Sequence, residues 1–442
     1  MEKNLTQGSV LKNILLFSLP FLLSNFLQTL YGMADLFIAG QFNGAQVISA
    51  VSIGSQVMHM LTVMITGLAM GATVLIGQAV GARNKEQSSK VIGNTITLFI
   101  IFSAIATFTL LALSVPIAKA IRTPPESLQQ TVSYLRICFV GIPFIIAYNV
   151  IASIYRGMGD SKSPMYFVMI ACSINIILDF VFMGNLKMGS QGAAIATVIA
   201  QAVSVAFGLF NMFKSKNGLT LKKTDLKISS EIMSSILKIG VPVSCQDGFI
   251  QISFIVITAI ANSRGVEVSA AVGIVEKIIC FLFLIPSAML STISAIAAQN
   301  IGAGLKDRAR KTLWDGILIA SGMGLFFAVI FQFLSGPTVK LFTSDETVQI
   351  LGTQYLRAYV TDCFFAAIHF CFSGYFCAMG KSIISFMHNS ISVIFFRIPG
   401  AWIASRFWPE TLTPMGLAAP IGSFASVIIC VLVYIIISRR KD

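Results

Sequence analysis

The chain alternates between long apolar runs and short polar segments along its whole length. Each run is long enough for an α-helix to cross about 30 Å of hydrocarbon, which takes about 20 residues. A transmembrane β-strand would instead show about 10 residues of alternating character. The pattern therefore predicts an all-α polytopic membrane protein with twelve transmembrane helices, at residues 14–39, 47–80, 91–118, 132–155, 164–184, 191–213, 233–261, 268–301, 312–336, 353–378, 383–404 and 413–437.

The composition also indicates a membrane protein, and the distribution of basic residues predicts how the protein is oriented in the membrane. Of the 442 residues, 56% are hydrophobic and 11% are charged, against about 25% charged in a typical soluble domain. The net charge of +13 would suit a nucleic-acid partner, but 21 of the 31 Lys and Arg lie in the two tails and the even-numbered loops and only six in the odd-numbered loops. By the positive-inside rule, this asymmetry predicts a multi-pass protein of the cell membrane with both termini cytoplasmic, membrane lipids around it and no nucleic-acid partner.

The two halves of the chain repeat one design. The segment "GQAVGARNKE" at 77–86 matches "AQNIGAGLKD" at 298–307, and the same shift along the chain maps "YLR" at 134–136 onto 355–357. We therefore predict two pseudo-symmetric six-helix bundles, at 1–213 and 232–442, joined by a cytoplasmic linker at 214–231. An even number of helices in each half makes this a parallel repeat, a plan that transport proteins use with a substrate site near the bilayer midplane.

Acidic side chains inside the apolar runs are the clearest functional signal. A charge at the bilayer centre costs at least about 2.5–3.5 kcal/mol, and such residues usually mark an ion or substrate path. Asp35 and Asp179 stand apart because the first half offers no basic residue deep in its spans. Without a cation, desolvation disfavours the charged carboxylate, so such groups take up H⁺ or Na⁺ near neutral pH. Asn175 lies one helical turn before Asp179 and on the same face. The alternative is a hydrogen-bonded aspartate pair that only locks helices together.

Other intramembrane charges carry weaker signals. Asp247 and Asp362 fit a substrate cavity and a structural role equally well. Pro20 predicts a bend in the first span, because proline removes a helix hydrogen bond. Two alternatives remain, a static kink and a bend that changes when Asp35 is neutralised. The remaining intramembrane charges are Glu276, Lys277, Arg136, Arg357 and Arg397, of which Arg136 and Arg357 are expected to extend towards the outer interface.

Several other classes of site receive no support. The phosphate-binding pattern GxxxxGK[ST] is absent, which argues against an ATPase. His59, His369 and His388 are too scattered along the sequence to suggest a metal or catalytic cluster, and we expect no metal centre and no cofactor. The eight cysteines all fall in predicted spans and are interpreted as small apolar side chains. The 18 Met and 35 Phe suit a cavity for large apolar ligands, although lipid-facing helices use the same residues.

The segments "SLPFLLSNFLQTLYGMADLFIAGQFNG", "GQAVGARN", "YRGMGDSKSP" and "INIILDFVFM" together resemble the multidrug and toxic compound extrusion (MATE) transporters, and most closely the DinF-like branch. The resemblance covers nearly the whole chain. It implies two bundles around a V-shaped cavity and exchange of cationic amphiphilic compounds for entering H⁺ or Na⁺, without an enzymatic reaction.

Within the resemblance, residue roles transfer position by position. It implies a cation-coupling site, able to hold Na⁺, formed by Asp35, Asn175, Asp179 and Thr197; substrate-cavity residues Tyr31, Tyr134 and Asn149; and Pro20 as the bending proline. Phe180 departs from the family pattern, which often has proline directly after the aspartate, and this puts the local helix geometry in doubt. Another branch of the family places its carboxylates on spans 7 and 10, where Asp247 and Asp362 lie, so a contribution from the second half stays open.

The expected mechanism is alternating access, in which ion loading at the aspartates releases the substrate outward. One alternative is a lipid-linked oligosaccharide flippase of the related superfamily, for which Arg397 and Lys277 would be the basic cavity residues. Another is an intramembrane enzyme with an aspartate dyad, but matched halves without a catalytic motif argue against it. Nothing in the sequence requires more than a monomer.

Overall fold

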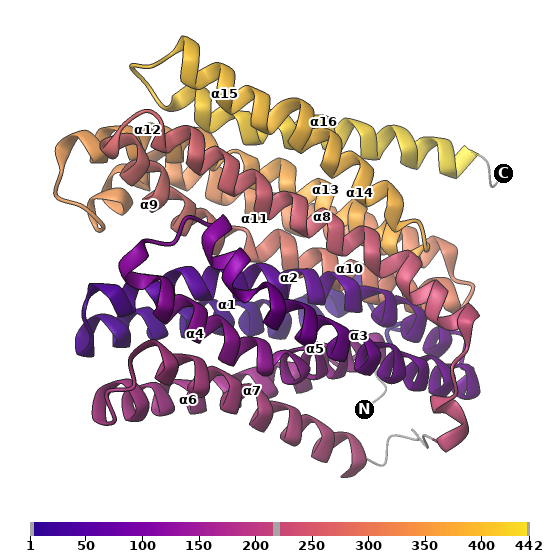
Figure 1. Ribbon diagram of the computed structural model, residues 1–442. Coiled ribbons are helices and arrows are strands. Elements are labelled where there is room, and N and C mark those ends of the chain that lie inside the picture. The colour runs from indigo at the N-terminus through magenta and orange to yellow at the C-terminus, as the bar shows by residue number, and fades with distance from the viewer. Residues whose placement is uncertain (1–3, 215–221, 440–442) are drawn as a thin grey trace. The chain divides into compact units, whose positions relative to one another are not determined.

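The computed structural model describes residues 4–214 and 222–439, and most of these residues lie in helices (Figure 1). The first half contains α1 (Val10–Phe42), α2 (Ala45–Gly81), α3 (Lys85–Ala120), α4 (Pro125–Val140), α5 (Ile142–Gly157), α6 (Lys162–Asp179), the π-helical segment η1 (Phe180–Asn185) and α7 (Gly189–Lys214). The 3-10 turn η2 (Lys223–Leu226) falls in the predicted linker, of which residues 215–221 lie outside the described residues.

The second half follows the same succession of long helices. It contains α8 (Ser230–Asn262), α9 (Val266–Leu282), α10 (Leu284–Gly302), α11 (Lys306–Lys340), α12 (Glu346–Tyr359), α13 (Asp362–Ala378), α14 (Ser382–Ile391), the π-helical segment η3 (Ser392–Arg397), α15 (Ile398–Phe407) and α16 (Thr413–Arg439).

Each predicted span has a helical counterpart. Among the described residues, ten helical segments are long and apolar enough to cross a membrane, and the bent pair α4–α5 makes an eleventh if it is taken as one span. The predicted span 383–404 corresponds to α14, η3 and α15, which follow one another without a gap. This region is not among the segments counted as long and apolar enough, which leaves eleven against the twelve predicted.

The chain divides into two compact units. Unit 1 is built mainly from Leu15–Gly240 and unit 2 mainly from Val241–Ile301 and the chain after Leu305. Unit 1 thus runs past the predicted boundary at 232 and includes the first turns of α8. In unit 1, α2 packs against α4 and α5, and α6 lies beside α7; in unit 2, α11 packs against α13, and α12 against α9 and α16 (Figure 1). Each unit has its own core of buried apolar side chains.

Local sequence signals explain several helix boundaries. The Asn84 side chain accepts a hydrogen bond from Gln87 N at 2.9 Å and caps α3, and Asp345 caps α12 through Val348 N at 3.0 Å. The pair α4–α5 bends by 49° at Gly141. A Cβ at Gly141 would lie 2.4 Å from Cγ2 of Val198, so only glycine lets α7 approach this bend so closely.

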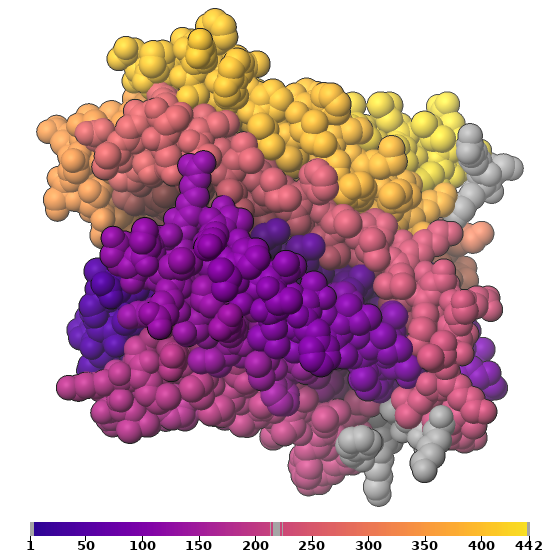
Figure 2. Space-filling view, viewed as in Figure 1, coloured from indigo at the N-terminus to yellow at the C-terminus, as the bar shows by residue number. Residues whose placement is uncertain are grey.

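Apolar side chains also cover the outside of the helices. Along α16 the exposed residues Leu417, Ile421, Phe424, Ile428 and Leu432 recur every three or four positions, so they form one stripe on the helix. The side chains of α16, coloured yellow, lie open on the face shown in Figure 2. Water would disfavour such a surface, whereas the hydrocarbon of a bilayer matches it.

Candidate ion-coupling site

The candidate site lies in unit 1, where α1 and α6 bring two carboxyl groups together. Asp35 of α1 is 2% exposed and Asp179, the last residue of α6, is fully buried. Their side chains are within hydrogen-bonding reach of each other. Two carboxyl groups in such contact share a hydrogen bond only when one of them carries a proton, because two carboxylates repel each other.

Asn175 joins this pair to α7. Its side chain lies one turn before Asp179, within hydrogen-bonding reach of Asp35. Its Nδ2 also donates to Thr197 Oγ1 at 3.5 Å, which is the long end of the range. The Thr197 hydroxyl in turn donates to Ala193 O at 3.0 Å, so its oxygen is oriented as an acceptor. The structure therefore brings all four predicted cation-coupling residues together.

Acceptor oxygens are in excess at this site. Within the described residues, Asp35 Oδ1, both Asp179 oxygens and Asn175 Oδ1 are buried and receive no hydrogen bond from a protein donor. Each buried polar atom without a partner costs about 1–3 kcal/mol. Oxygen is the ligand type that hard cations prefer, and a proton on either carboxyl would supply a donor. The four atoms thus fit a proton or a small monovalent cation.

A transition-metal centre has no comparable support here. No group of three or more His, Cys, Asp or Glu side chains with metal-binding geometry occurs in residues 4–214 and 222–439. The two carboxyl groups with one amide and one hydroxyl present only oxygen ligands.

Aromatic residues surround the carboxyl pair. Tyr31 lies one turn before Asp35 on α1, and the charge of Asp35 acts electrostatically on the hydroxyl groups of both Tyr31 and Tyr134. The Tyr134 hydroxyl is 3.1 Å from Ser55 Oγ, and its ring packs over Gly54, where a Cβ would lie 2.2 Å from the ring. These contacts fix the Tyr134 ring beside the site.

Asn149 is held by its own set of contacts. Its Oδ1 accepts a hydrogen bond from Thr66 Oγ1 at 2.8 Å, and its Nδ2 donates to Ile145 O at 2.9 Å. The side chain is 4% exposed. Its polar atoms are therefore already paired within α2 and α5.

Pro20 lies inside α1, which is one continuous helix from Val10 to Phe42. Proline leaves one helix carbonyl without its usual donor. The next residue, Phe21, packs under the guanidinium group of Arg156 at 5.2 Å from ring centroid to Cζ, and Arg156 is 5% exposed. Arg156 therefore contacts α1 directly beside the proline.

In unit 2 the acidic residues are arranged differently. Asp362 of α13 is buried and forms an ion pair with Arg397, at 3.0 Å from Oδ2 to the guanidinium nitrogen, and Arg397 also donates to Ser423 Oγ at 2.9 Å. Asp247 of α8 forms no ion pair among the described residues, and its charge acts electrostatically on Cys377. The two predicted residues thus have different neighbours, and Asp362 already has a cation beside it.

Two features of unit 2 were not evident from the sequence. The sequence suggested that the histidines are scattered, but α13 and α14 bring the rings of His369 and His388 to 5.6 Å between centroids. Ser373 Oγ lies 2.9 Å from His388 Nε2. The spacing of Asp362, His369 and Ser373 along α13 places them on one helix face and could have indicated a buried polar strip.

Comparison with known proteins places these observations in context. A model of the MatE family matches the chain twice, at residues 20–181 and 242–403. The two matches are equally long, and one shift along the chain relates both their starts and their ends, which agrees with the internal repeat seen in the sequence.

Curated relatives match over most of the chain. The probable multidrug resistance protein YoeA of Bacillus subtilis is 29% identical over 353 residues, covering 78% of this chain and 76% of that protein. The probable multidrug resistance protein YpnP of the same organism is 28% identical and covers 91% of both chains. The multidrug export protein MepA of Staphylococcus aureus is 25% identical and covers 85% of this chain and 83% of that protein.

Solved structures show the same fold at lower sequence identity. A MATE protein in the straight conformation superimposes with a TM-score of 0.92 at 22% identity, covering 99% of this chain and 98% of that chain. A MOP superfamily transporter from Pyrococcus furiosus superimposes with a TM-score of 0.93 at the same identity and coverage.

Proposed function

Since the chain belongs to the MatE family, we propose that it is a secondary active multidrug exporter, which exchanges cationic amphiphilic compounds for entering H⁺ or Na⁺ by alternating access. The relatives with multidrug resistance and export in their names support the export of drugs. The observation that carries the coupling is the buried Asp35–Asp179 pair with its excess of acceptor oxygens.

The coupling step follows from the charge of this pair. When both carboxylates are ionised, their repulsion and their unpaired oxygens favour a cationic substrate or an ion nearby. When an H⁺ or Na⁺ is bound, that attraction is cancelled and the substrate leaves. Asn175 and Thr197 orient the pair through the contact between Asn175 Nδ2 and Thr197 Oγ1.

Movement of α1 would connect ion loading to substrate release. Asp35 and Pro20 lie on the same continuous helix, four turns apart. Neutralising Asp35 removes its repulsion with Asp179 and changes the force that holds this part of α1 against α6. We assign the resulting bend to Pro20, where the helix lacks one hydrogen bond.

The membrane potential drives export only when more positive charge enters with the ions than leaves with the cationic substrate. One net elementary charge that enters per transport cycle across 100 mV contributes about 2.3 kcal/mol. This free energy sustains a substrate gradient of roughly 50-fold, at about 1.4 kcal/mol per factor of ten.

We place the protein in the cell membrane as a monomer with both termini in the cytoplasm, on the asymmetry of its basic residues. The flippase alternative loses one of its two basic residues, because Arg397 is paired with Asp362 and Ser423. An aspartate-dyad enzyme would use the same Asp35–Asp179 pair, but the relatives named as multidrug exporters favour transport. As an exporter, the protein would have small cationic amphiphiles and membrane lipids as partners and would need no cofactor.

Transport by the purified full chain in proteoliposomes tests this function. An inward Na⁺ gradient and an inward H⁺ gradient are imposed separately, and ethidium movement is followed together with ²²Na⁺ uptake or internal pH. Ethidium movement coupled to one of the two ion fluxes supports exchange and identifies the ion. Ethidium movement that neither gradient drives would contradict the proposal.

A further inference from the structure

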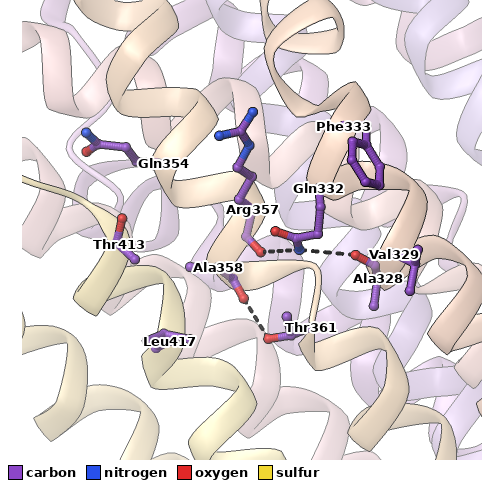
Figure 3. A pocket seen from close by; sticks show the side chains of 10 residues that line it. All are labelled: Ala328, Val329, Gln332, Phe333, Gln354, Arg357, Ala358, Thr361, Thr413 and Leu417. Atoms are coloured by element: carbon purple, nitrogen blue, oxygen red, sulfur yellow. Dashed lines mark hydrogen bonds between the residues drawn. The ribbon is translucent and has the colours of Figure 1, made fainter.

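Unit 2 contains a cavity of about 720 Å³ that has one polar and one apolar end (Figure 3). Arg357, Gln354 and Thr413 line the polar end, and Val329 and Phe333 of α11 line the apolar end. None of the ten residues that line it is acidic. Val329 is 53% exposed and Phe333 75% exposed, so the apolar end continues into the outer surface of α11.

The Arg357 guanidinium is not paired with another part of the chain. It makes no hydrogen bond or ion pair within residues 4–214 and 222–439, and its side chain is exposed. Only its backbone carbonyl is engaged, by Gln332 Nε2 at 3.1 Å. Figure 3 shows the guanidinium group pointing away from Gln332 and towards the end of the cavity where Gln354 lies.

The equivalent arginine of unit 1 is bound internally. The shift that maps residues 77–86 onto 298–307 also maps Arg136 onto Arg357 and Ser114 onto Ser335. Arg136 Nε donates to Ser114 Oγ at 3.2 Å. Ser335 instead donates its hydroxyl proton to Phe331 O of its own helix, so it does not hold Arg357. The repeat therefore places an equivalent arginine in each unit. The one whose side chain has no partner within the described residues is Arg357, which lines the cavity.

The neighbouring polar groups are fixed in position. Gln354 Oε1 accepts hydrogen bonds from Leu412 N at 3.1 Å and from Thr411 Oγ1 at 2.9 Å. These bonds hold the Gln354 side chain against the loop that precedes α16, and its NH₂ group remains as a donor. A guanidinium and an amide NH₂ at one end of a cavity are suited to bind an oxyanion.

From these contacts we propose that the cavity binds one anionic phospholipid, with the headgroup phosphate on Arg357 and an acyl chain along the exposed face of α11. Arginine binds phosphate through two parallel N–H···O bonds. The absence of an acidic lining residue favours a net negative headgroup over a zwitterionic one. The exposed Val329 and Phe333 explain why the ligand is a lipid and not a free anion, because a free anion gains nothing from them.

Native mass spectrometry of the purified full chain tests this site with phosphatidylglycerol and phosphatidylcholine that have identical acyl chains. The wild type is expected to bind the first phosphatidylglycerol about fivefold more tightly, the factor that corresponds to ~1 kcal/mol for one basic side chain at an anionic headgroup. Arg357→Gln should remove this preference and Arg357→Lys should keep part of it. The matched control Arg136→Gln removes the same charge from the equivalent position and should keep the preference.

Three results would overturn the site: equal binding of both lipids by the wild type, a preference that survives Arg357→Gln, or an equal loss in Arg136→Gln. Displacement of phosphatidylglycerol by inorganic phosphate alone would also contradict a lipid site. If Arg357→Gln does not fold, Val329→Trp takes its place. This substitution fills the apolar end and should weaken the binding of the first lipid molecule of either class. Unchanged binding by Val329→Trp would contradict the proposed position of the acyl chain.

Discussion

Among single residues, the two aspartates of unit 1 are the most important for the proposed function. Asp35 and Asp179 could be selected from the sequence because a carboxyl group in an apolar run without a nearby cation is costly. Their direct contact could not be predicted, since it depends on how α1 and α6 pack. The pairing of Asp362 with Arg397 was missed for the same reason, because 35 residues separate the two partners.

Asn175→Ala should weaken ion binding while the chain remains folded. The substitution removes the amide that reaches both Asp35 and Thr197. A hydrogen bond to a charged group contributes about 1.5–3 kcal/mol, so the ion concentration for half-maximal ethidium transport should rise about tenfold or more. Ser173→Ala on the exposed side of α6 is the matched control and should leave this concentration unchanged. An unchanged value in Asn175→Ala would remove Asn175 from the site.

Asp362→Asn should destabilise unit 2, because it leaves the buried guanidinium of Arg397 without its counter-charge. Removing one partner of a buried ion pair costs about 3–5 kcal/mol. The double variant Asp362→Asn/Arg397→Met removes both charges and should recover most of this loss. Thermal unfolding in detergent measures the effect, and a double variant as unstable as the single one would show that the pair has no such coupling.

At the scale of helices, the spans were largely predictable and their interruptions were not. The apolar runs gave twelve spans, and every one has a helical counterpart. The π-helical segments η1 and η3 were not predicted, because periodicity does not distinguish one wide turn from a regular one. The signal at η1 was Phe180, where the family pattern often has proline. Here Phe180 begins the π-helical segment directly after Asp179 and packs against Phe42 at 6.0 Å between ring centroids.

The bend between α4 and α5 gives a test at this scale. Gly141→Ala places a Cβ 2.4 Å from Val198 Cγ2, and the stiff β-branched side chain cannot turn aside easily. We expect a loss of stability of about 1–3 kcal/mol from overpacking. Gly141→Ala/Val198→Ala should regain part of it in thermal unfolding. A single variant as stable as the wild type would show that the bend tolerates a side chain.

At the scale of the whole molecule, the repeat was visible in the sequence and the difference between its copies was not. In unit 1 the Asn175 side chain lies beside Asp35, whereas in unit 2 Arg397 forms an ion pair with Asp362. The buried aspartate thus has a neutral amide nearby in unit 1 and a charged guanidinium beside it in unit 2. We therefore propose the ion site in unit 1, where the acidic oxygens lack a protein donor, and not at Asp362, which already has a cation beside it.

Topology is tested by fusions to the C-terminal end. Positive-inside counting predicts a cytoplasmic C-terminus. A fused green fluorescent protein should then fluoresce in a bacterial host, and a fused alkaline phosphatase should be inactive. A fusion after Glu410, in the loop before α16, should give the opposite result for both reporters. Active phosphatase at the C-terminus would reverse the proposed orientation.

In the proposed mechanism, Asp179 links ion entry to substrate export. The most direct measurement is ethidium transport in proteoliposomes under the coupling-ion gradient, for the wild type, Asp179→Asn and the loop control Glu410→Gln. The wild type and the control should move ethidium against its own gradient, whereas Asp179→Asn, shown to be folded by size-exclusion chromatography, should not. Gradient-driven accumulation by Asp179→Asn at the wild-type level would contradict the account.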